Sequence, residues 1–77
     1  MESMIGKSLD LGDEGSFVIQ EIIIENEDHA TLKGEHFAVK DGEEVRTNIS
    51  MLNIYETSEP IAEENLFHIE WVVWELS

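Results

Sequence analysis

Apolar residues in this chain come in short blocks that are separated by turn-forming residues. The blocks are rich in β-branched and aromatic side chains, which fit the pleated surface of a strand. They predict five strands, at residues 4–11, 16–25, 29–39, 44–56 and 66–76. Because each strand follows the last after a short turn, we predict a mainly β fold: a five-strand antiparallel meander that forms a small barrel or an open sandwich.

Glycine, asparagine and aspartate mark three of the turns. The segment 12–15 contains two glycines, which supply positive φ, and an aspartate that caps its own backbone. The segment 26–28 is a second polar turn between two apolar blocks. The segment 40–43 carries Asp41-Gly42 between two extended runs, and this dipeptide predicts a tight two-residue hairpin.

The fourth predicted strand changes the parity of its apolar residues part-way along. Its first inward residues, Val45, Ile49 and Met51, occupy odd positions. The next two, Leu52 and Ile54, occupy even positions. Side chains alternate between the two faces of a regular strand, so one inserted residue is needed to keep both sets on one face. The pattern therefore predicts a β-bulge near Met51.

The C-terminal segment fits two structures. A helix over 59–76 begins well, with a polar residue, Pro60 and acids in its first turns. Such a helix leaves the aromatic residues of this run largely off its apolar stripe. A strand over 66–76 is favoured because the run is dense in aromatic and β-branched side chains. The alternative fold is therefore α+β, a four-strand sheet with a C-terminal helix over 59–76.

Length and composition predict one small acidic domain, residues 1–77. The 77 residues include 18 Asp and Glu, four Lys and Arg, and no cysteine, for a formal net charge of −14. No apolar run reaches the ~18 residues of a membrane span, and no signal-peptide layout opens the chain, so we expect a cytoplasmic protein. The charge argues against direct binding to nucleic acid or a membrane, and it favours a basic surface on a partner protein.

No residue pattern points to catalysis or to a cofactor. No serine sits in a Gly-x-Ser-x-Gly elbow, and the triplet 6–8 lacks the upstream glycine of a phosphate-binding loop. The carboxylates and histidines around His29 and His36 match no metal-ligand spacing, and the acids at 10–14 lack the EF-hand pattern. We therefore expect no enzyme activity, no cofactor and no metal site.

We predict that carboxylates on strands and turns bind the partner. Fourteen unbalanced charges correspond to roughly 24 Å of duplex DNA, and a compact chain of this length is about 30 Å across. The charge density is therefore comparable with that of DNA, provided that the acids lie in one stripe. An aromatic residue on an exposed last strand would add an apolar contact. The predicted partner-binding residues are Gln20, Glu21, Glu25, Glu27, Asp28, Glu35, Asp41, Glu43, Glu44 and Trp74.

In length, charge and absence of catalytic motifs, the chain resembles small acidic phage inhibitors, among them DNA-mimic anti-CRISPR and anti-restriction proteins. Within that class, the run Phe-Val-Ile-Gln-Glu-Ile at 17–22 is similar to the strand with which uracil-DNA glycosylase inhibitors enter their target. Those inhibitors have a serine where this chain has Ile22, and the similarity covers six of 77 residues. The resemblance implies that Gln20 and Glu21 contact the partner, in the cytoplasm of a phage's host.

Three functions are consistent with these residues. The first is an inhibitor that occupies the basic nucleic-acid-binding surface of a nucleic-acid-processing enzyme as a DNA mimic, with charge steering the encounter. The second is a small structural or assembly module that oligomerises, for example as a homodimer, through its C-terminal aromatic strand. The third is an immunity protein or antitoxin that neutralises a basic toxin, and it shares the physics of the first.

Overall fold

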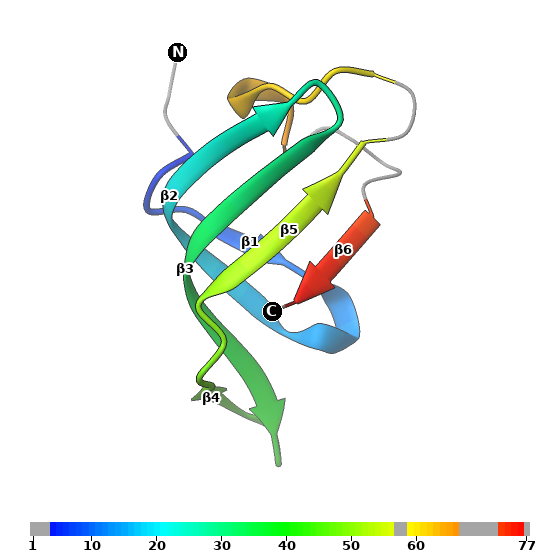
Figure 1. Ribbon diagram of the computed structural model, residues 1–77. Coiled ribbons are helices and arrows are strands. Elements are labelled where there is room, and N and C mark those ends of the chain that lie inside the picture. Colours follow the sequence, from blue (N-terminus) through cyan, green and yellow to red (C-terminus); the bar gives the residue numbers. More distant parts are fainter. Residues whose placement is uncertain (1–3, 57–58, 67–72, 77) are drawn as a thin grey trace.

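The chain folds into an antiparallel meander of β-strands. The computed structural model describes residues 4–56, 59–66 and 73–76, and for 73–76 it describes the backbone alone. The strand order is β1-β2-β3-β5-β6, and β4 pairs with β3 beyond the end of β5 (Figure 1). The strands are β1 (Ser8–Asp10), β2 (Ser16–Asn26), β3 (His29–Lys40), β4 (Glu43–Arg46), β5 (Met51–Tyr55) and β6 (Val73–Leu76).

The predicted mainly β fold is confirmed, and its open form is the one observed. No pairing joins β1 to β6 in the part of the chain that the structure describes, so the sheet does not close into a barrel. The alternative helix over 59–76 is wrong. In its described residues, 59–66 and 73–76, the chain forms a short 3₁₀ turn, η2 (Glu63–Asn65), and the strand β6, which pairs with β5 through Ile54 and Trp74 among other residues.

The turns follow the local chemistry of their residues. The 3₁₀ turn η1 (Gly12–Glu14) occupies the predicted turn before β2. Between β2 and β3, the amide of Asp28 donates to Asn26 Oδ1 at 2.8 Å. Asp41 and Gly42 both have positive φ, 53° and 81°, which is the signature of the two-residue hairpin predicted between β3 and β4.

The predicted bulge interrupts the fourth predicted strand and divides it into β4 and β5. Four residues, 47–50, lie opposite the three residues 34–36 of β3, because Arg46 pairs with Phe37 and Met51 pairs with Lys33. One extra residue therefore precedes Met51, as the change of parity predicts.

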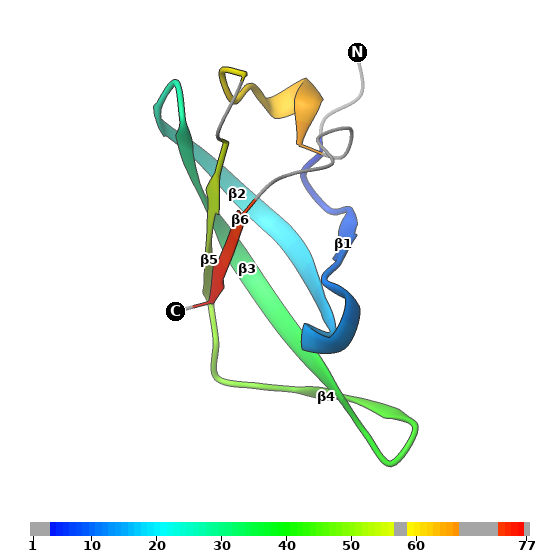
Figure 2. The same cartoon turned by 90° about the vertical axis from the view of Figure 1, so that its right-hand side faces the viewer.

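The bulge keeps only part of the predicted apolar set in the core. Leu52 and Ile54 are fully buried, as predicted, whereas Ile49 and Met51 are half-buried. Val45, which was predicted to face inward, is 41 % exposed. The prediction for Val45 is wrong because the β3–β4 hairpin projects beyond the layer that covers the rest of the sheet (Figure 2).

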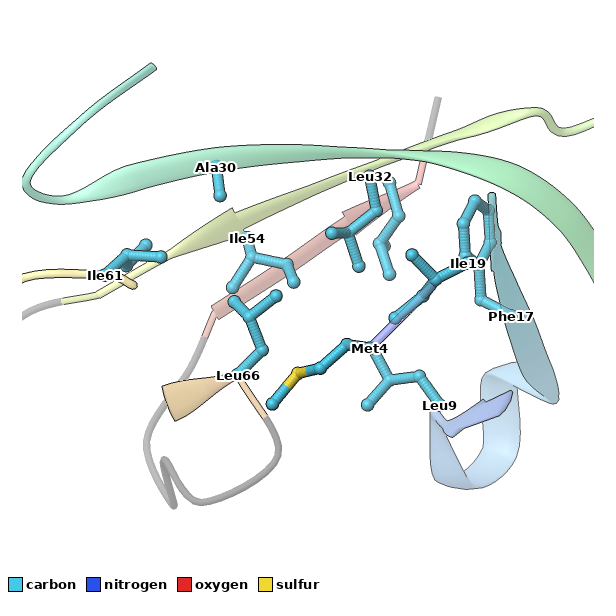
Figure 3. Close-up of a cluster of buried hydrophobic side chains, with 10 residues drawn as sticks. Met4, Leu9, Phe17, Ile19, Ala30, Leu32, Ile54, Ile61 and Leu66 are labelled. Atoms are coloured by element: carbon cyan, nitrogen blue, oxygen red, sulfur yellow. The ribbon is translucent and has the colours of Figure 1, made fainter. Parts of the chain in front are cut away.

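The hydrophobic core lies on one face of the sheet, where segments near both ends of the chain cover it. The cluster is drawn in Figure 3 and comprises Met4, Leu9, Phe17, Ile19, Ala30, Leu32, Leu52, Ile54, Ile61 and Leu66. Six of these residues come from β2, β3 and β5, and the covering four come from residues 4–9 and 61–66. Among the described residues, no helix is long and apolar enough to span a membrane.

Candidate protein-interaction surface

One end of the sheet brings together the β2–β3 turn and the chain that follows β5 (Figure 1). Two backbone hydrogen bonds join them: Glu56 N donates to Asp28 O at 2.8 Å, and Ile61 N donates to Glu27 O at 2.5 Å. The buried side chains of Ile61 and Leu66 then fix this second segment against the core. Two acidic stretches that lie far apart in the sequence are therefore neighbours in the fold.

This juncture, which we call the acidic end, gathers carboxylates without a balancing cation in its segments 25–28 and 56–66. A further carboxylate, that of Glu56, lies beneath its surface with the residue only 3 % exposed, and Glu56 Oε1 accepts a hydrogen bond from Glu59 N at 3.2 Å. The exposed or half-buried carboxylates of the acidic end belong to Glu25, Glu27, Asp28, Glu59, Glu63 and Glu64.

A second acidic region lies at the tip of the β3–β4 hairpin. It contains Asp41, Glu43 and Glu44, all exposed, but also the cations Lys40 and Arg46. The twelve residues of β3 separate it from the acidic end, and an extended strand of that length covers about 36 Å. The longest dimension of the molecule is 37 Å, so the two acidic regions occupy its opposite ends.

Cations interrupt the surface between the two acidic regions. Glu21 lies directly opposite Lys33 in the register of β2 and β3. Glu35 Oε1 lies 3.7 Å from a guanidinium nitrogen of Arg46, with the Arg46 side chain 67 % exposed. Gln20 is exposed at a bulge of β2, where the register shifts between Ile19 and Glu21. The predicted binding residues therefore do not form one unbroken acidic stripe.

The last predicted contact residue, Trp74, belongs to β6. Its backbone pairs with Ile54 of β5, and β6 is the final strand in the order of the described sheet. The side chain of Trp74 is outside the described part of the structure, so its role as an exposed aromatic contact stays a prediction. Trp71, which was predicted to share this strand, lies outside the described residues.

His29 and His36, whose surroundings match no metal-ligand spacing in the sequence, lie on opposite faces of the sheet. His36 is buried, with Nε2 2.6 Å from Glu14 O and Nδ1 2.9 Å from Thr47 Oγ1. His29 is half-buried and its ring stacks on that of Tyr55 on the other face. Within the described ranges, no group of three or more possible metal ligands and no pocket is found.

Sequence patterns identified only half of the acidic end. Glu25, Glu27 and Asp28 are predicted contact residues, whereas Glu59, Glu63 and Glu64 are not. The available signal was the run of acids around Pro60. Its position beside the β2–β3 turn depends on two long-range backbone hydrogen bonds, which local patterns do not reveal.

Fold and surface together define a class: a small open-sheet β protein with a concentrated acidic end. No known protein family matches the chain, and neither a curated protein nor a solved structure is similar to it.

Proposed function

We propose that the protein is an inhibitor that occupies the basic nucleic-acid-binding surface of a partner protein. The acidic end is the principal contact, because its two adjoining segments carry six exposed or half-buried carboxylates and neither segment contains lysine or arginine. Such a concentration attracts a cationic groove over a distance of about one Debye length, roughly 8–10 Å at moderate salt. The opposing charges accelerate association and exclude nucleic acid from the same groove.

The spacing of the two acidic regions supports imitation of duplex DNA. The acidic end and the hairpin tip lie at the two ends of β3, about 36 Å apart along the strand. One turn of B-DNA repeats every ~34–36 Å. A protein that contacts phosphates one turn apart would therefore meet negative charge at both positions.

The proposal is tested by removing three charges from either end of the molecule. The acidic-end variant carries Glu27→Gln, Asp28→Asn and Glu64→Gln. The matched hairpin variant carries Asp41→Asn, Glu43→Gln and Glu44→Gln. All six side chains are exposed, and each variant loses the charge of one aspartate and two glutamates.

The protein is first used to capture partners from a bacterial lysate at low salt. We expect duplex DNA or high salt to release the captured protein, because both compete for its cationic groove. With that partner purified, the acidic-end variant should associate at least about tenfold more slowly than the unchanged protein at low salt. The hairpin variant should lose less. An association rate that is unchanged by salt, by DNA and by both sets of substitutions would contradict the proposal.

The position of β6 favours assembly as a second candidate function. In the described sheet β6 pairs with β5 on one side only, and an edge strand offers unpaired backbone groups to another chain. Sedimentation at increasing concentration separates the candidates: an assembly module forms a stable oligomer by itself, whereas a competitor stays monomeric until its basic partner is added.

A further inference from the structure

The face of the sheet opposite the core, here called the outer face, is left open by the described elements. Strand β1 and the segment 59–66 both lie on the core side (Figure 2). The register places Ile23, Thr31 and Asn53 side by side in one row on the outer face. The adjacent row along the strands points to the core on the other face. Thr31 is only 5 % exposed although no described element covers it, so its neighbours pack closely around it.

Two stacked rings, those of His29 and Tyr55, lie at one end of the outer face. The rings of His29 and Tyr55 stack with centroids 4.6 Å apart and planes 10° from parallel. His29 Nε2 lies 3.2 Å from Asn53 Oδ1, and Thr31 Oγ1 donates to the same oxygen at 3.2 Å. An amide oxygen only accepts, so Nε2 of His29 carries the proton. These contacts hold His29 against Tyr55 before any partner arrives, which lowers the entropy cost of binding there.

Charge around the pair favours a cationic occupant. His29 follows the acidic turn residues Glu27 and Asp28 in the sequence and begins β3, so the pair adjoins the acidic end. A second copy of this chain is a poor occupant, because its net charge is −14. Its single arginine, Arg46, lies near the opposite end of the molecule beside Glu35.

We propose that the His29–Tyr55 pair receives an arginine side chain of a basic partner protein. A guanidinium is planar and weakly hydrated and stacks on aromatic rings, whereas an ammonium is compact and strongly hydrated. The acidic end attracts both cations, and the aromatic pair selects arginine. This inference rests on the proposed function and specifies which cation the acidic surface recognises.

The test compares an oligo-arginine peptide with an oligo-lysine peptide of equal length. Both are titrated into the isotope-labelled full chain, and NMR amide shifts report affinity and position. We expect the arginine peptide to bind about two- to fivefold more tightly, since a cation–π contact at an exposed site is of that size. The largest shift differences between the peptides should fall at His29, Asn53 and Tyr55.

Two variants separate recognition from structural damage. Tyr55→Leu keeps an apolar side chain but removes the ring, and it should abolish the preference for arginine while both peptides still bind. Met51→Leu is the matched control on the outer face of the same strand, and it should preserve the preference. Equal affinities in the unchanged protein, or a preference that survives Tyr55→Leu, overturn the inference while the proposed function stands. Failure of both peptides to bind overturns both.

Discussion

Gly34 lies where the fold leaves no room for a side chain. It lies in β3 opposite Ile19, beside the β2 bulge, and an added Cβ would collide with the backbone carbonyl of Val18 and approach the Phe17 ring to 3.1 Å. Because backbone and a fully buried ring cannot move aside cheaply, Gly34→Ala should lower the free energy of unfolding by about 2 kcal/mol or more. Urea unfolding of both proteins measures this loss.

Gly12→Ala provides the control for the general cost of replacing a glycine. Gly12 has φ of +64°, and the space around its added Cβ is open. Only the left-handed backbone penalty applies, about 1 kcal/mol. If both alanine variants lose the same stability, close approach of the two strands is not what requires glycine at position 34.

Single residues differ in how far the sequence predicts their roles. Asp41-Gly42 specifies its hairpin by itself, because positive φ at two adjacent residues is a local requirement. The need for Gly34 arises from the neighbouring strand, so it is invisible until β2 and β3 are paired. Val45 resembles a core residue in sequence, yet its strand lies outside the covered part of the sheet.

At the scale of elements, His36 joins three separate pieces of the fold. Its ring bridges η1, through Glu14 O, and the bulged segment, through Thr47 Oγ1, while its own backbone belongs to β3. His36→Leu removes both contacts and leaves the part-buried carbonyl of Glu14 without its donor. We expect a loss of about 1–3 kcal/mol in the free energy of unfolding, measured in urea.

Thr47→Val is the partial version of the same change. Its side chain keeps nearly the same volume, but the hydroxyl contact with His36 Nδ1 is lost while the bond to Glu14 O stays. This variant should lose less stability than His36→Leu. A larger loss from Thr47→Val would show that the bond from Ile49 N to Thr47 Oγ1, at 3.1 Å, matters more than the histidine.

Elements with local signals were predictable, and their long-range contacts were not. β-branched content and polar turns locate β2 and β3 to within one residue of their observed ends, and the parity change locates the bulge before Met51. Within the described segment 59–66, the helical start signals around Pro60 yield the short turn η2 and no longer helix. Ile61 bonds to Glu27 and packs with Leu66 into the core, and these tertiary contacts outweigh the local helix propensity of the segment.

At the scale of the whole molecule, the distribution of charge matters more than its sum. The cations Lys33 and Arg46 lie near Glu21 and Glu35, so repulsion is partly offset in the middle of the molecule. The acidic end lacks such neighbours within its own segments, and its buried Glu56 and its hydrogen bonds hold like charges close together. Repulsion among the carboxylates of the acidic end destabilises the folded protein, whereas the same charges attract the proposed basic partner.

Salt should therefore stabilise this protein. Screening weakens repulsion between exposed carboxylates, and a gain of about 1 kcal/mol corresponds to a rise in Tm of about 4–8 °C for a domain of this size. The Glu35–Arg46 pair opposes the trend only slightly, because exposed pairs contribute little. Calorimetry of the acidic-end variant should show a smaller response to salt than the hairpin variant shows, because its substitutions already remove the densest repulsion. Equal responses would mean that repulsion is spread over the molecule, and the acidic end would then be no better contact for a basic groove than the hairpin tip.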